Sequence, residues 1–136
     1  MKSVTKQEKG QSLVEFAILL PVFLLILVGI AEFGRGWMTK NILTGAAREG
    51  ARVAAVQLDP AASGSQGKLA ASGVLNSAGI PAPPAVVSVI DPGLSIPSIR
   101  VDVTYTYTVS VLNFVPGLPG PNINLAGTAT MRRERY

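Results

Sequence analysis

Side chains that carry acid–base, nucleophilic or metal-binding chemistry are few in this sequence. Its 136 residues include no cysteine, no histidine and only eight aspartates and glutamates, which are scattered along the chain. The commonest general base, the thiol nucleophile and the usual zinc ligands are therefore absent. No group of carboxylates has the spacing of a calcium-binding loop. We predict no catalytic residue, no metal site and no cofactor, and we expect that the protein is not an enzyme.

One carboxylate stands out by its surroundings. Glu15 directly precedes FAILLPVFLLILVGIA (16–31), a run without any charged residue. With its flanks as far as Trp37 this segment reaches the ~20 residues that cross a bilayer, and Trp37 lies where an interfacial aromatic is expected. An ionised carboxylate costs about 2.5–3.5 kcal/mol at the bilayer centre and less near the edge. Glu15 therefore needs a partner that offsets this cost.

The helical pattern continues beyond the apolar run. We predict one helix from about residue 11 to residue 56, on the order of 70 Å long. Its last part carries small residues at intervals of three and four, which form a narrow stripe: Gly45, Ala46, Ala47, Gly50, Ala51, Ala54 and Ala55. Such a stripe allows a close approach of another helix. It fits a helix of a neighbouring subunit or the molecule's own sheet. We expect that the apolar half of the long helix needs lipid and that the stripe needs other subunits to cover it.

Two pairs of opposite charge share the faces of this helix. Glu32 and Arg35 lie three residues apart at the expected membrane exit, and Glu49 and Arg52 repeat that spacing. A solvated pair of this kind contributes a few tenths of a kcal/mol. The alternative is that either pair makes a contact between subunits.

The remaining residues, 57–136, predict a small α+β domain. A short helix is expected at about 68–77, with Leu69 and Leu75 as its apolar contacts. The sequence SIRVDVTYTYTVSV (98–111) alternates strictly between apolar or aromatic and polar residues, which indicates a strand with one buried face. Further strands are expected near 85–90 and 123–133. The predicted fold class is α+β, with a long N-terminal helix followed by a small antiparallel sheet that packs on its outer half.

The net charge of +4 does not indicate nucleic-acid binding. Three of the twelve basic residues (Lys2, Lys6 and Lys9) lie within the first ten positions. The rest form no basic face with interleaved aromatics, which a nucleic-acid surface would require. We expect neither a nucleic acid nor a small-molecule substrate as partner.

The order of residues at the N-terminus is typical of a prepilin. A basic leader ends in Gly10 and Gln11, Glu15 is the fifth residue after the glycine, and an apolar helix follows. The sequence GQSLVEFAILLPVFLLILVGIAEFGR, followed by AAREGARVAAV, resembles the TadE-like family of tight-adherence (Tad) pilus proteins over residues 10–56. The closing AGTATMRRERY is also similar to how such chains end.

The resemblance implies a minor pilin or pseudopilin of the inner membrane. Residues 1–10 would be a cytoplasmic leader, which a prepilin peptidase cuts off between Gly10 and Gln11. Residues 11–37 would span the membrane, and residues 38–56 would continue the helix outside it. The mature protein would join or assist a thin adhesive pilus built by a secretion-type ATPase machine. Its partners would be membrane lipid, the peptidase, other pilin or TadE-like subunits and the assembly platform.

Cleavage would give Glu15 the partner it needs. The new α-amino group of Gln11 lies one helical turn away, and a positive charge within a few ångströms offsets the cost of the carboxylate. The amine could belong to the same chain or to a neighbouring subunit, and we favour the neighbour, where the pair would set the axial register of the filament.

Two other functions fit the same sequence. An uncleaved membrane scaffold of the pilus machine would retain Lys2 to Lys9. A secreted binding domain would begin near Glu32, after a signal sequence ending in Gly29-Ile30-Ala31. Basic residues also follow the span, at Arg35 and beyond, so the positive-inside rule does not choose an orientation. The cytoplasmic position of the leader rests on the family resemblance.

Overall fold

A computed structural model of the chain describes residues 4–80, 85–90, 98–110 and 120–133. The first three residues of the predicted leader and residue 111, the last of the predicted central strand, lie outside the described residues. The elements follow in the order α1 (Val4–Ala55), α2 (Pro60–Ser77), β1 (Ala85–Ile90), β2 (Ser98–Thr108) and β3 (Asn122–Arg132). The predicted class is confirmed, because a long apolar helix precedes a small antiparallel three-stranded sheet.

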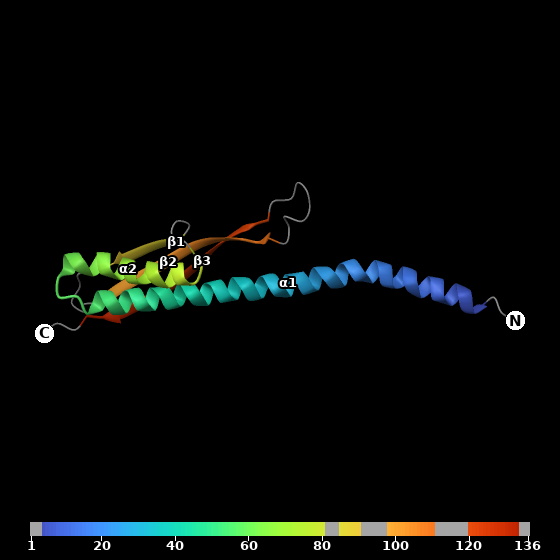
Figure 1. The fold of residues 1–136 in the computed structure, drawn as a ribbon, viewed down its shortest axis with the longest axis horizontal. Coiled ribbons are helices and arrows are strands. Elements are labelled where there is room, and N and C mark those ends of the chain that lie inside the picture. Colours follow the sequence, from blue (N-terminus) through green and yellow to red (C-terminus); the bar gives the residue numbers. More distant parts are fainter. Residues whose placement is uncertain (1–3, 81–84, 91–97, 111–119, 134–136) are drawn as a thin grey trace.

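The long helix α1 determines the shape of the molecule. Its 52 residues extend about 78 Å at 1.5 Å per residue. It begins at Val4, earlier than predicted, because lysine, glutamine and glutamate in the leader are good helix formers. Figure 1 shows its N-terminal half projecting away from the rest of the chain and bending gently, and that half contains Pro21. A proline inside a helix removes one backbone hydrogen bond and favours such a bend.

A short turn reverses the chain between α1 and α2. Pro60 begins α2, where its missing N–H costs no helical hydrogen bond. The buried hydroxyl of Ser63 donates to the carbonyl of Ala54 at 2.8 Å, and so satisfies one of the last carbonyls of α1. From this turn α2 runs back along α1 (Figure 1).

Helix α2 differs from its prediction. It starts eight residues earlier than expected, at Pro60, and ends at Ser77 as predicted. Leu75 is fully buried, but 66% of Leu69 is exposed, so the prediction that Leu69 makes apolar contacts is wrong. The reason is that the inward face repeats every fourth residue, at Ser63, Gly67, Ala71 and Leu75, all of which are buried. Leu69 lies between these positions and points away.

The C-terminus of α2 is closed by a glycine. Gly79 has a φ of 75°, which a residue without a side chain adopts easily. The N–H of Ile80 then donates to the carbonyl of Leu75 at 2.9 Å, the long backbone bond of a Schellman motif. The side chain of Ile80 turns back into the core, where it is almost completely buried.

The sheet has the order β1-β2-β3, and both pairings are antiparallel. Its central strand β2 has the predicted alternation of burial. Ile99, Val101 and Val103 are fully buried, whereas Thr104 and Thr106 are exposed. One face of the sheet therefore lies on the helices, with α1 against β2 and β3 and α2 against β1.

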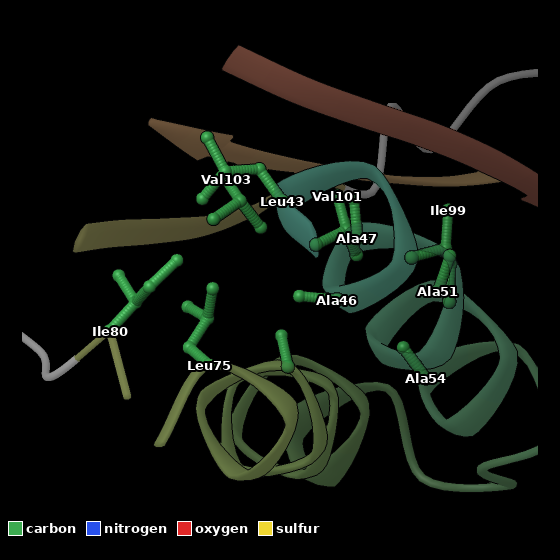
Figure 2. Packing of buried hydrophobic residues seen from close by; sticks show 11 residues of the cluster. Leu43, Ala46, Ala47, Ala51, Ala54, Leu75, Ile80, Ile99, Val101 and Val103 are labelled. Atoms are coloured by element: carbon green, nitrogen blue, oxygen red, sulfur yellow. The ribbon is translucent and has the colours of Figure 1, made fainter. Parts of the chain in front are cut away.

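The core lies between the C-terminal half of α1, helix α2 and the sheet. Figure 2 shows Ala46, Ala47, Ala51 and Ala54 of α1 directed toward α2 and β2. The small-residue stripe is thus covered by the molecule's own sheet and its own second helix. The expectation that this stripe needs other subunits is wrong, because α2 fills the place of the neighbouring helix. Gly45, on the outer side, is exposed.

The helix and the sheet approach each other very closely at Gly127 of β3. A Cβ atom at this position would overlap the backbone of Leu43 and Thr44 in α1. Gly127 is paired with Val103 in the register, so it lies opposite the centre of the buried face of β2. A glycine inside a strand often marks such an approach of another backbone. The absence of a side chain at Gly127 therefore allows α1 to pack directly against the backbone of β3.

Candidate processing and membrane-assembly site

The predicted processing residues lie in the projecting half of α1. Gly10, Gln11 and Glu15 are all exposed, and a Cβ atom at Gly10 would meet nothing within 4 Å. The side-chain amide of Gln11 donates to Oε1 of Glu15 at 3.2 Å, across one helical turn. In the uncut chain this neutral amide is therefore next to the carboxylate. Cleavage after Gly10 would put an α-amino group on the same residue.

The apolar residues that follow Glu15 have no cover within the described chain. This half of α1 is long and apolar enough to cross a membrane, and none of its most apolar 18-residue window is buried. Large apolar side chains are exposed on every side of the helix: Phe16, Ile18, Leu19, Leu20, Val22, Phe23, Leu24, Leu25, Ile26, Leu27, Val28 and Ile30. A helix that is apolar all round is stable only when lipid or protein surrounds it.

Glu32 marks the point where α1 meets the sheet. Its carboxylate accepts a hydrogen bond of 2.6 Å from the hydroxyl of Tyr107 in β2 and lies 3.3 Å from the guanidinium of Arg35. Only 9% of Glu32 is exposed, so it is not the solvated residue that its spacing to Arg35 suggested. The hydrogen bond to Glu32, together with partial burial, raises the pKa of Tyr107. A pair separated by 75 residues in sequence thus joins the membrane helix to the sheet.

The second pair of charges is exposed. Arg52 donates to both carboxylate oxygens of Glu49, at 3.0 and 2.7 Å. The hydrogen bond from Arg52 and its charge hold the pKa of Glu49 below its usual range. This geometry is that of a solvated pair within one helix, and it lies well outside the apolar half of α1.

The outer face of the sheet carries polar pairs that the sequence analysis did not single out. Thr106 donates to Asn124 at 3.0 Å and Thr108 donates to Asn122 at 2.8 Å, across β2 and β3. Nearer the other end, Asp102 accepts from Thr128 at 2.8 Å. The alternating threonines of β2 indicate a polar outer face in the sequence. Their partners in β3 could not be predicted, because they depend on the register between the two strands.

The described side chains offer no centre for a metal ion. No three of the aspartates and glutamates within the described ranges gather closely enough to hold one. The residues that the sequence proposed for processing and register, Gly10 to Glu15, are instead separated from Glu32 by about five to six turns of helix. The residues Gly10 to Glu15 and the residue Glu32 therefore lie at opposite ends of the apolar half of α1.

Comparison with known proteins gives one finding. Residues 10–52 match the family model described as TadE-like protein. The match begins at Gly10, includes Glu15 and Glu32, and ends at Arg52, all within α1. No curated protein and no solved structure matches the chain. The resemblance to the TadE-like family is confirmed over these residues. A TadE-like segment on an apolar N-terminal helix fits a component of a Tad pilus in a membrane.

Proposed function

We propose that this TadE-like chain is a minor pilin or pseudopilin of a Tad pilus, held in the inner membrane by the N-terminal half of α1 before assembly. The observation that carries the proposal is that the matched segment is α1 itself, and that its apolar half has no cover within the described chain. The contribution of such a protein to the pilus is structural. Its sheet and α2 stabilise the outer half of the helix, and the inner half remains available to lipid and then to other subunits.

In this proposal a prepilin peptidase cuts the leader, residues 1–10, from the cytoplasmic side. Gln11 becomes the first residue of the mature chain. The 20 residues from Gln11 to Ile30 extend about 30 Å, which equals the hydrocarbon thickness of a bilayer, and the residues as far as Trp37 complete the predicted span of 11–37 at the interface. Glu32 then lies at the outer edge, and the sheet lies on the extracytoplasmic side. The contact between Glu32 and Tyr107 supports this boundary, because a buried polar pair with a tyrosine hydroxyl fits the wet side of an interface.

Glu15 has the role of a register residue. A carboxylate near the inner edge of the membrane gains from a positive charge close by, and the only new charge that processing creates is the amine of Gln11. Within one chain the two residues are already joined by a hydrogen bond through the Gln11 side chain. In a filament the amine of a neighbouring subunit could take this place. Pairing between subunits would fix how far each helix slides along the next.

The intact mass and the N-terminal sequence of the mature protein test this function. The chain is expressed with a prepilin peptidase in a bacterial host and extracted from membranes. We expect a protein that begins at Gln11 and fractionates with the inner membrane. A retained leader would contradict processing and favour the uncleaved scaffold. A protein free of membrane that begins near Glu32 would identify the secreted domain.

A matched pair of variants makes the result specific. Replacing the residue before the cut, Gly10→Leu, should leave the leader attached. Gly29→Leu puts the same side chain on the same helix, 19 residues away, and meets nothing within 4 Å at its Cβ. This control should be processed normally. Equal processing of both variants would exclude Gly10 as the recognised residue.

A further inference from the structure

Strand β3 forms one edge of the sheet and pairs with β2 alone among the described strands. At its start the N–H of Val109 donates to the carbonyl of Pro121 at 3.2 Å, which makes these two residues a hydrogen-bonded pair of the antiparallel ladder. Such pairs recur at every second residue. The odd-numbered residues of β3 therefore bond to β2, and the even-numbered residues, from Asn122 to Arg132, direct their N–H and C=O groups away from it. In the described part of the chain no hydrogen bond reaches these outward-directed groups.

This edge lacks the features that keep edge strands apart. The 11 residues of β3, NINLAGTATMR, include no proline and no charge before the last residue, Arg132. The register with β2 advances without a bulge, and the outward-directed residues are all exposed. Edge strands are usually short, charged, bulged or covered, because a row of unpaired N–H and C=O groups pairs readily with another strand. The edge of β3 is thus suited to bind an extended strand.

The strand β3 runs in the same direction as α1. Gly127, in its middle, lies against Leu43, and Arg133, just after its end, donates to the carbonyl of Gln57 at 3.4 Å. Figure 1 shows the sheet extending lengthwise along α1. On the proposed function, on which this inference rests, the N-terminal half of α1 enters the membrane. The β3 strand of every copy then points away from the membrane.

The other edge of the sheet, β1, complements this one. Because the odd-numbered residues of β2 bond to β3, the even-numbered ones bond to β1. Ala85, Val87 and Val89 therefore direct their backbone groups outward, and no hydrogen bond from a described residue reaches them. Both pairings in the sheet are antiparallel, so β1 runs in the same direction as β3. Two copies in the same orientation can thus join β3 of one to β1 of the next as a parallel pair in one continuous sheet.

The membrane decides between this arrangement and its alternative. Antiparallel pairing of β3 with β3 of a second copy reverses α1 in that copy, so its apolar half points away from the membrane. Parallel pairing of β3 with β1 keeps both apolar halves in the membrane. It also matches in height. Ser88 lies opposite Asp102, and Asp102 lies opposite Thr128, so a copy at the same level brings its Ser88 beside Thr128.

We propose that the edge of β3 binds the edge of β1 from a second copy of this chain, as a parallel strand pair outside the membrane. The contact is heterologous, because different surfaces of the two copies meet. It leaves β1 of the first copy and β3 of the second available to further copies, so repetition gives a ring or an open chain. The folded domain thus carries an assembly surface of its own, in addition to the apolar half of α1.

Disulfide cross-linking of the full chain in membranes tests the proposal. The sequence has no cysteine, and Ser88 and Thr128 are exposed, so Ser88→Cys and Thr128→Cys introduce the only thiols. Within one chain β2 separates the two positions by roughly 10 Å, which exceeds the ~7 Å between Cα atoms that a disulfide tolerates. The double variant should therefore cross-link only between copies. We expect a ladder of dimers, trimers and larger products, at least fivefold above either single variant.

The single variants show which strands meet. Abundant dimers of Thr128→Cys alone would indicate antiparallel pairing of two β3 edges and would overturn the proposal. A small shift in height between copies is covered by moving this cysteine, as Ala126→Cys or Thr130→Cys. The absence of a ladder at all three positions would also overturn the proposal.

A proline on the edge provides a second readout. Ala126→Pro removes an N–H that points outward, so it takes no hydrogen bond from the ladder between β2 and β3. Ala126→Val keeps this N–H and is the matched control. In the double-cysteine chain we expect Ala126→Pro to lower cross-linking at least fivefold and Ala126→Val to leave it unchanged. Thr130→Pro replaces the first proline variant if that variant melts at a lower temperature than the control. Equal cross-linking of the proline and valine variants would refute pairing at this edge.

The outcome is independent of the test of function. Processing at Gly10 and membrane fractionation are measured on the same preparations. A processed, membrane-bound protein that forms no ladder refutes only the strand pairing. An unprocessed or soluble protein refutes the proposed function, whatever its cross-links.

Discussion

Glu32 is a carboxylate that the fold has removed from water beside the most apolar part of the chain. Burial of a charged group is costly unless hydrogen bonds and an opposite charge compensate for it. Tyr107 supplies the hydrogen bond from β2, and Arg35 supplies the charge from α1. Every buried polar side-chain atom within the described residues has a partner. The Glu32–Tyr107 bond therefore ties the free end of the sheet to the helix at a defined height.

Removal of the Tyr107 hydroxyl should loosen this attachment. Tyr107→Phe leaves the Glu32 carboxylate without its donor from the sheet, and we expect a loss of about 1–2 kcal/mol in the free energy of unfolding. The matched control is Tyr105→Phe, on the same face of β2, whose hydroxyl bonds to no described residue. It should change stability by less than about 0.5 kcal/mol. Denaturant unfolding in detergent, followed by the fluorescence of Trp37, measures both. Equal losses would show that the hydrogen bond to Glu32 does not stabilise the folded domain.

The stability of the folded domain should depend on pH through Asp102. Partial burial alone would raise the pKa of Asp102, but hydrogen bonds from Thr128 and Arg100 and the charge of Arg100 outweigh it, so the pKa lies below its ordinary value. A carboxylate with a lowered pKa stabilises the folded state above its unfolded pKa of ~3.9. That contribution is lost as the pH falls through the lower folded value.

The variant Asp102→Asn should therefore be less stable than the wild type at pH 6, by up to about 1 kcal/mol for so exposed a pair. The difference should shrink as the pH falls below about 4, because the wild-type carboxyl becomes protonated. Melting temperatures of both proteins between pH 3 and pH 6 test the sign. A difference that grows toward low pH would contradict the lowered pKa.

At the scale of elements, the contact of α1 with β3 depends on the absence of one side chain. Gly127→Ala would drive a methyl group into the backbone of Leu43 and Thr44, which cannot move aside as a flexible side chain can. We expect destabilisation of about 3 kcal/mol or more, at the upper end of the range for overpacked cores. Gly45→Ala, on the exposed face of the same helix, should instead stabilise α1 by about 0.5–1 kcal/mol. Thermal unfolding compares the two. Tolerance of Gly127→Ala would mean that the helix and sheet are packed less closely.

Elements with a strong local pattern were predictable from the sequence. The apolar run and the alternation from Ile99 to Val109 follow directly from periods of 3.6 and 2 residues. Contacts between elements were not predictable, because they depend on distant residues. The burial of Glu32 requires Tyr107, and the early start of α2 is supported by Ser63, which bonds to α1. The close crossing of Gly50 and Gly67 likewise pairs two glycines whose meeting no local pattern indicates.

At the scale of the whole molecule, α1 has two halves with different surroundings. The C-terminal half is buried by the sheet and α2, with five of its side chains in the core cluster: Leu43, Ala46, Ala47, Ala51 and Ala54. The N-terminal half is exposed around its whole circumference. The described residues of the domain thus bury their own core, whereas the apolar residues of the projecting half have no cover among the described residues. On the proposed function, assembly would change the surroundings of the N-terminal half, and variants there need not affect the stability of the domain.

The variant Glu15→Gln tests whether assembly and the stability of the domain depend on different halves of α1. Glu15 is exposed and bonds to Gln11 within the chain, far from the core. Replacement by the neutral amide removes the cost of a carboxylate near the membrane, so insertion and the melting temperature of the domain should not fall. Pairing with the amine of a neighbouring subunit would be lost, and incorporation into pili should drop at least tenfold. Glu49→Gln, which removes a carboxylate from the solvent-facing side of the C-terminal half of α1, is the control and should assemble normally. Quantification of the protein in sheared pili and in membranes measures both steps, and undiminished incorporation of Glu15→Gln would refute the register role.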